Sequence, residues 1–190
     1  MSRDLHTDSD ILSMLCQVAL VAALCACLLV DSCEPAHASA PREWTRDEVA
    51  IARLTVSEAS FGGGADARVI TWIVAHAAAR RGMAPAQYVA EVHHRHTRSS
   101  QRPWLAGLDE TLREPAGWPS DVPWQRGALA WEQRLADVRR YLADDRHGCD
   151  GTPVTWGGTV DRERITRMVG NGYRVVRCGA TANVFLGRRP

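Results

Sequence analysis

Glu58 is the residue with the strongest claim to chemistry, because its position places a carboxylate on the apolar face of an expected helix. The stretch 45–64 reads TRDEVAIARLTVSEASFGGG, and within it Ile51, Leu54 and Glu58 have the spacing i, i+3, i+7. Side chains at that spacing share one helix face. A glutamate among apolar side chains loses hydration, which raises its pKa, and a glutamate protonated near neutral pH is suited to act as a general acid. The alternative is a glutamate at the rim of the helix that pairs with an arginine.

Other groups that could do chemistry have weaker patterns. Glu132 lies beside the apolar stripe of a later helix and is the second-choice carboxylate, while Asp66 is expected to cap a helix. His93, His94 and His96 suggest a metal site at first, but no further ligand follows at a recognised spacing. A solvated basic edge is therefore favoured there, and no metal is predicted.

Helical patterns dominate the residues that would position Glu58. Thr45 and Glu48 have the spacing of a capping box, so the first helix should begin there and end at the glycines 62–64. Further elements are expected in order: helices at about 66–81, 85–92, 121 or 123 to 142, and 161–169, a long loop at 97–123, and a short strand at 173–177. The patterns predict a mainly α (α+β) fold with a small irregular or β-containing C-terminal part. The glycines at 62–64 and 157–158 do not follow expected strands, so no nucleotide loop and no cofactor is expected.

The N-terminal segment differs in composition from the rest of the 190-residue chain. Ile11–Val30 is an apolar run long enough to span a bilayer, and the sequence Ala-His-Ala at 36–38 fits cleavage by a signal peptidase. Residues 1–38 are therefore expected to be a signal peptide or an N-terminal membrane anchor, and residues 39–190 a single catalytic domain. That domain carries 22 arginines and 17 acids, a net charge of +5, which favours anionic partners such as cell-wall polymers, nucleic acid or lipid head groups.

Cysteine usage agrees with export. Four of the six cysteines lie in or just after the apolar run, and only Cys149 and Cys178 remain in the body of the chain. Two cysteines in an exported domain can pair, and we expect a disulfide between them. The alternative is a pair of free buried thiols, which would be the better expectation for a cytosolic protein.

Several segments together resemble the cell-wall hydrolases of the spore-cortex-lytic type, which are lysozyme-like lytic transglycosylases. The motif SEAS around Glu58, the glycine-bearing turn after it and the segment ARVITWIVAHAAARRG are similar to the catalytic region of that family. The Ser99-Ser100-Gln101 segment with Trp104 lies where the family has a Q-F-S-like element, and residues 181–185 (TANVF) are similar to its closing motif. The resemblance covers about residues 45–186. One departure is that Phe61 and glycines replace the second acid that often follows the catalytic glutamate.

The resemblance implies a lysozyme-like catalytic domain that cleaves the MurNAc-GlcNAc bond of peptidoglycan, with Glu58 as the catalytic residue. It also implies a glycan groove, whose expected lining is Ser100, Gln101, Trp104, Thr155, Trp156 and Asn183. Turn or packing roles are the alternative for each of these, and Trp104 in particular could pin the long loop to the core. The expected partner is a peptidoglycan strand and not nucleic acid, and the expected protein is a monomer in the periplasm, cell envelope or medium. A two-carboxylate glycoside hydrolase and a non-enzymatic wall-binding module remain the alternative functions.

Overall fold

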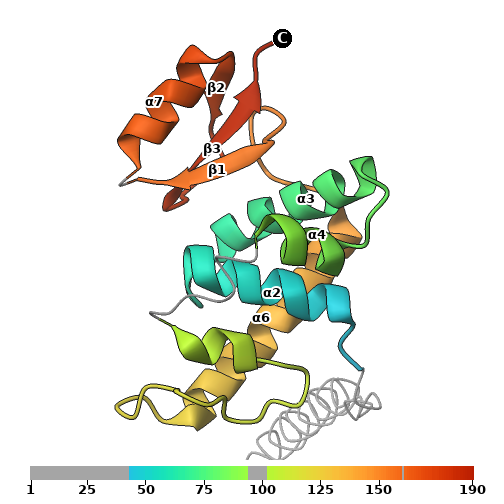
Figure 1. Ribbon diagram of the computed structural model, residues 1–190, viewed down its shortest axis with the longest axis vertical. Coiled ribbons are helices and arrows are strands. Elements are labelled where there is room, and N and C mark those ends of the chain that lie inside the picture. The colour runs from blue at the N-terminus through green and yellow to red at the C-terminus, as the bar shows by residue number, and fades with distance from the viewer. Residues whose placement is uncertain (1–42, 94–101, 160) are drawn as a thin grey trace, which may run out of the picture. The chain divides into compact units, whose positions relative to one another are not determined.

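The computed structural model describes residues 43–93, 102–159 and 161–190, which belong to one compact unit of the chain (Figure 1). The predicted signal or anchor segment, with Ile11–Val30, lies outside the described residues, as do Ser100 and Gln101. Within the described ranges, no helix has the length and apolar character needed to cross a bilayer.

Helices make up the first two thirds of this unit. They are α2 (Arg46–Ala59), α3 (Gly64–Arg80), α4 (Pro85–Val92), a 3-10 helix η1 (Pro103–Gly107) and α6 (Trp124–Asp144). A strand β1 (Thr155–Gly158), a helix α7 (Arg162–Gly170) and strands β2 (Tyr173–Val176) and β3 (Asn183–Arg188) follow. The predicted fold class, mainly α with a small β-containing C-terminal part, is confirmed.

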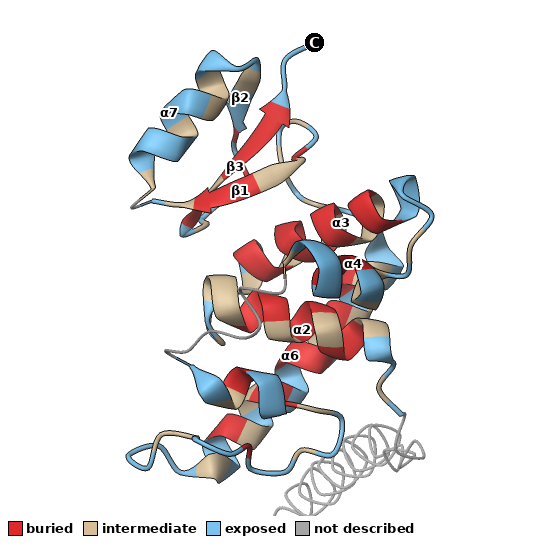
Figure 2. Ribbon diagram, in the orientation of Figure 1, coloured by how far each residue is buried: buried red, intermediate tan, exposed pale blue. Residues whose placement is uncertain are grey.

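The helix α2 forms the centre of the helical part, because it packs against α3, α4 and α6. It begins as predicted, with Thr45 Oγ1 accepting a hydrogen bond from the Glu48 N–H at 3.2 Å and the Thr45 N–H donating to Glu48 Oε2 at 2.7 Å. Ile51 and Leu54 are fully buried, and Figure 2 shows the buried positions of the helices along the sides that face one another. Burial of this apolar stripe is what stabilises the helix in water.

The sequence misplaced two features of the helices. Helix α3 begins at Gly64 after Gly63, and its N-terminus has no side-chain cap, so the capping role predicted for Asp66 is wrong. A Cβ at Gly63 would lie 2.2 Å from the Ala59 carbonyl oxygen, which explains why the turn uses glycine. The spacing of the apolar residues at 128–142 also predicts that Leu129 lies on the apolar stripe of α6, but Leu129 is 68% exposed.

The three strands form an antiparallel sheet in the order β1-β3-β2. Trp156 of β1 and Val176 of β2 both pair with Phe185, which is buried at the centre of β3. Only β2 was predicted. The strand β1 reads TWGG, and two glycines weaken any strand pattern, while the Thr-Ala-Asn start of β3 reads as a turn.

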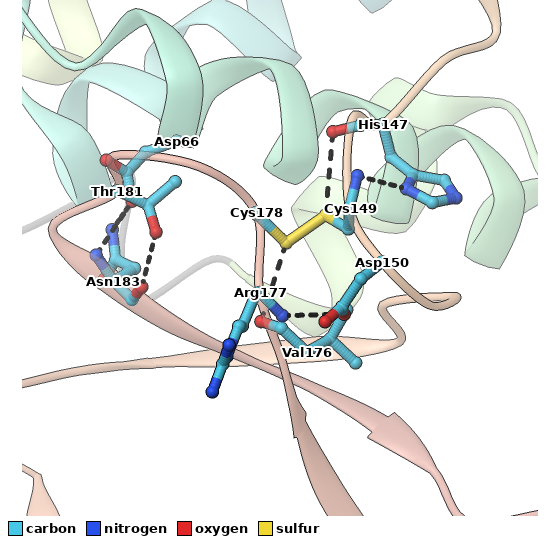
Figure 3. The surroundings of a disulfide bond; sticks show 9 residues. All are labelled: Asp66, His147, Cys149, Asp150, Val176, Arg177, Cys178, Thr181 and Asn183. Atoms are coloured by element: carbon cyan, nitrogen blue, oxygen red, sulfur yellow. Dashed lines mark hydrogen bonds between the residues drawn. A yellow bond between two sulfur atoms is a disulfide. The ribbon is translucent and has the colours of Figure 1, made fainter.

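The predicted disulfide is confirmed. Cys149, in the connection after α6, is bonded to Cys178, in the connection after β2, at an S–S distance of 2.05 Å (Figure 3). Next to it, the Asp150 N–H donates to the Arg177 carbonyl oxygen, and the Arg177 N–H donates to Asp150 Oδ1, both at 2.9 Å. The cross-link therefore joins the end of the helical part to the sheet, and it is consistent with an extracellular location.

We expect replacement of both Cys149 and Cys178 by alanine to lower the free energy of unfolding by about 3–4 kcal/mol, because opening a loop of this length restores chain entropy to the unfolded state. Urea unfolding followed by circular dichroism would measure it. The wild type should lose the same amount in reductant and the variant nothing. A wild type that is insensitive to complete reduction would contradict the prediction.

A second prediction concerns the ion pair between Glu48 and Arg139. Glu48 is 5% exposed and accepts a hydrogen bond from Arg139 Nη2 at 2.8 Å. Burial by itself raises the pKa of Glu48, but hydrogen bonds from Arg139 and Thr45 and the Arg139 charge outweigh it, so the pKa is lowered overall. A carboxyl group with a lowered folded-state pKa stabilises the fold above its unfolded-state pKa, and the stabilisation is lost as the pH falls through the folded-state pKa.

We therefore expect Glu48→Gln to cost about 2–3 kcal/mol of unfolding free energy at neutral pH, from the loss of a charged hydrogen-bond acceptor. The difference from wild type should shrink as the pH falls below the ordinary glutamate range of about 4.3. Chemical denaturation across a pH series would measure both. Glu132→Gln, at an exposed position of α6, is the control and should change the free energy of unfolding by less than about 0.5 kcal/mol at neutral pH. A Glu48→Gln cost that is constant with pH would contradict the assignment.

Candidate functional site

Glu58 lies in the last turn of α2, where the helix meets the sheet. Its side chain is half-buried, and Oε2 accepts a hydrogen bond from the indole Nε1 of Trp156 in β1 at 3.0 Å. An indole N–H is only a donor, and Oε2 can accept from it whether the carboxyl group is charged or carries its proton on the other oxygen. The carboxyl group is therefore held in one orientation by a residue 98 positions later in the chain.

Trp156 is itself held firmly. It is 6% exposed, and its ring stacks on that of His93, the residue that follows α4, with ring centroids 5.1 Å apart and planes 17° from parallel. The neighbouring strand β3 pairs with β1 and places Phe185 opposite Trp156, which fixes the Trp156 backbone. The hydrogen-bond donor to Glu58 therefore has little freedom to move. This placement makes Trp156 a positioning residue for Glu58, and the predicted contact with a glycan stays a prediction.

Asp66 joins the helices to the sheet beside Glu58. Its carboxylate, 3% exposed, accepts hydrogen bonds from the backbone N–H groups of Ala182 and Asn183 and from Asn183 Nδ2, each at 2.9 Å. Asn183 Nδ2 also donates to the backbone carbonyl oxygen of Glu58 at 3.2 Å. Figure 3 shows Asp66 and Asn183 facing one another. A buried charge needs such a set of donors, and these donors place the first residues of β3 against the ends of α2 and α3.

The turn after Glu58 is held by a residue that sequence reasoning missed. Arg134 of α6 is 1% exposed, and its Nη2 donates to the carbonyl oxygens of Ser60 at 3.0 Å and Phe61 at 2.7 Å. Ser60 has φ 56°, a conformation that a residue with a side chain rarely adopts. Burial lowers the pKa of Arg134, against the nearby charge of Asp137. The sequence contains a pattern that indicates the burial of Arg134, because this residue follows the buried Trp131 by three positions and so lies on the apolar face of α6.

Trp104 and Thr155, two predicted sugar contacts, belong to η1 and β1. Trp104, in η1, stacks on Phe61 with ring centroids 6.1 Å apart, and Trp118 contacts both rings edge-on. The Trp118 indole N–H donates to the Val122 carbonyl oxygen at 2.7 Å, so these rings hold the long loop in place. Thr155 is the half-buried first residue of β1, next to Trp156. Sugar contact by Trp104 or Thr155 stays untested.

The other candidate groups lie elsewhere. Glu132 is exposed on α6. Within the described ranges, no cluster of three or more histidine, cysteine or acidic residues could hold a metal ion, and His94 and His96 lie outside those ranges. The arrangement therefore offers one oriented carboxyl group, able to give and take a proton, with buried residues that fix its position.

Comparison with protein-family models, with curated proteins and with solved structures finds no match to this chain. The functional assignment therefore depends on the residues and their geometry.

The Asp66 contacts lead to a prediction for the stability of the site. Asp66→Asn should lower the free energy of unfolding by about 3 kcal/mol, because an amide turns one acceptor into a donor that faces other N–H groups. The matched control is Asp150→Asn, which changes an exposed aspartate that also accepts a backbone N–H bond. It should cost less than about 1 kcal/mol. Equal costs for the two variants, measured by urea unfolding, would show that Asp66 does not join the helices to the sheet.

Proposed function

We propose that the protein is an exported enzyme that cleaves peptidoglycan, a lytic transglycosylase acting on the MurNAc-GlcNAc glycosidic bond with Glu58 as its acid and base. The observation that carries this proposal is the carboxyl group of Glu58, half-buried at the end of α2 and oriented by the Trp156 indole N–H. A carboxyl group fixed in this way is pre-organised for proton transfer. A module that only binds the cell wall gains nothing from it.

Neither Asp66 nor Glu132, as the structure describes them, suits the role of a second catalytic carboxylate, which favours transglycosylation over hydrolysis. Two-carboxylate hydrolases need a second acid across the sugar from the first. Both oxygens of Asp66 already accept hydrogen bonds from the start of β3, and Glu132 is exposed on another helix. Asp66 and Glu132 are therefore not suited to activate a water molecule or to attack a sugar beside Glu58.

The proposed reaction uses one carboxyl group twice. Glu58 donates its proton to the oxygen that bridges the two sugars as the bond from that oxygen to the anomeric carbon breaks. The resulting carboxylate stabilises the positive charge that develops on the sugar. A hydroxyl group of the same sugar then bonds to the anomeric carbon and gives its proton to Glu58. The products are a shortened glycan and an anhydro sugar end, and Glu58 returns to its protonated state.

The proposed surroundings of the glycan follow from the same residues. Thr155 and Trp104 would contact sugars on either side of Glu58, with Ser100 and Gln101 added from the loop at 97–101. Asn183 would act as a positioning residue, because its amide group already donates to Asp66 and to the Glu58 carbonyl oxygen. A lysozyme-like arrangement, with the acid at a helix end beside a small antiparallel sheet, is part of the proposal. The disulfide and the net charge of +5 for residues 39–190 suit an exported protein that binds an anionic wall.

We expect Glu58→Gln to abolish the release of muropeptides from purified peptidoglycan, because glutamine cannot donate the proton. The rate should fall by about a thousandfold or more, within the range that loss of general acid catalysis produces. The thermal midpoint should change little, since the amide oxygen can still accept the Trp156 bond. Glu132→Gln is the control and should retain full activity.

Mass spectrometry of the products separates the mechanisms. Anhydro ends support transglycosylation, whereas reducing ends would show a hydrolase. A Glu58→Gln protein with wild-type activity, or a folded wild-type protein that binds peptidoglycan without cleaving it, would overturn the enzymatic proposal. The second result would identify a wall-binding module.

A further inference from the structure

A second polar site is formed by residues from the end of α3, from α4 and from the sheet with the residue before β1. It is a cavity of about 470 Å³ lined by Ala77, Arg80, Arg81, Tyr88, Val154, Tyr173 and Arg188. That volume suits a small ligand or a short piece of a polymer. The lining that the structure describes contains three arginines, two tyrosines and no acid.

Two of the three arginines lie over tyrosine rings of the same cavity. The Arg81 guanidinium lies over the Tyr88 ring at 5.2 Å, and the Arg188 guanidinium lies over the Tyr173 ring at 5.2 Å. Stacking on a ring occupies the face of a guanidinium and leaves its in-plane N–H groups available. Within the described ranges, no carboxylate forms an ion pair with Arg80, Arg81 or Arg188. Arg80, Arg81 and Arg188 are exposed side chains that line one cavity, and positive charges gathered in this way are suited to bind an anion.

A row of rings connects this cavity to Glu58. Tyr88, which lines the cavity and is 8% exposed, lies 5.6 Å from the ring of His93. His93 stacks on Trp156, and Trp156 donates to Glu58. Arg80 is at the end of α3, whose start carries Asp66, and Arg188 is at the end of β3, whose start carries Asn183, so the cavity lies roughly 15–20 Å from Glu58 along these elements. If a glycan binds at Glu58, a long charged substituent of that glycan, such as a peptide stem of about five residues, could reach the cavity.

We propose that this arginine cavity, formed around Arg80, Arg81 and Arg188, binds the carboxylate groups of the peptide stems that peptidoglycan sugars carry. The inference depends on the proposed function for the identity of the glycan, but not for the chemistry of the cavity. Carboxylates match the flat, paired N–H groups of arginine. The cavity would then select glycan strands that still carry their peptides over strands from which the peptides have been removed.

The test measures binding without cleavage, using the full chain with Glu58→Gln. Its affinity is measured by calorimetry for soluble glycan strands that carry peptide stems and for the same strands after an amidase has removed the stems. Arg80→Gln with Arg188→Gln should weaken binding to the peptide-bearing strands by about tenfold, as expected for the loss of charge-assisted hydrogen bonds, and should leave binding to the stripped strands unchanged. The control is Arg126→Gln with Arg167→Gln, which removes the same charge from two exposed positions outside the cavity.

The outcomes separate this proposal from the proposed function. An equal loss with the control pair would show a general charge effect and would overturn the site. If poly(glycerol phosphate) or inorganic phosphate binds in an Arg80- and Arg188-dependent way and the stem peptides do not, the cavity is a phosphate site and the proposal is wrong. Selective loss for peptide-bearing strands supports the cavity even if the wild type releases no muropeptides. Muropeptide release that requires Glu58, with no dependence on the cavity, would leave only the enzymatic proposal standing.

Discussion

The contact between the buried Asp66 carboxylate and the first residues of β3 is the interaction on which the candidate site depends. A charge that is 3% exposed would be costly without partners, and here three N–H groups surround it. All three donors come from Ala182 and Asn183, so satisfying the charge requires β3 to begin at this point. Because β1 pairs with β3, the same contact determines where Trp156 lies. The orientation of Glu58 is therefore a consequence of a buried charge on another helix.

The disulfide is a second connection between the helical part and the sheet, and the two are comparable in strength. Hydrogen bonds to a charged group contribute about 1.5–3 kcal/mol each, and a disulfide that closes a loop of this length contributes about 3–4 kcal/mol. They act at different places: Asp66 holds the start of β3, while Cys149 and Cys178 join the connections that follow α6 and β2. The sheet is therefore held at two points, which restricts rotation as well as separation.

The sequence predicted the features that depend on neighbours along the chain. The Thr45 capping box, the apolar face with Ile51 and Leu54, and the mainly helical class all follow from spacing within one helix or from the number of helical patterns. The disulfide was also predictable, since Cys149 and Cys178 are the only cysteines outside the first 38 residues. Because helix patterns depend on neighbours along the chain, the sequence also predicted a helical unit with a carboxylate at the end of one helix.

The features that the sequence did not reveal all depend on contacts between distant segments. The local sequence predicts a helix cap at Asp66, and nothing near Asp66 indicates the donors at Ala182 and Asn183, over 110 residues later. Arg134 resembles any surface arginine unless its place on the apolar face is noticed. The strand β1 has a weak pattern because half of it is glycine, and its role comes from the single tryptophan it carries.

The residues around Glu58 divide between those that could touch a substrate and those that can only position it. Trp156 and Asn183 are buried, and their hydrogen-bond donors are directed at Glu58 and Asp66. Arg134 fixes the turn that follows α2 by donating hydrogen bonds to two of its carbonyl oxygens. Each of these residues stabilises a position of the carboxyl group, and none needs to move for a proton to be transferred. A site built in this way accounts for a strained residue at Ser60: the backbone cost of about 1–3 kcal/mol is offset by contacts that fix the end of α2, where Glu58 lies.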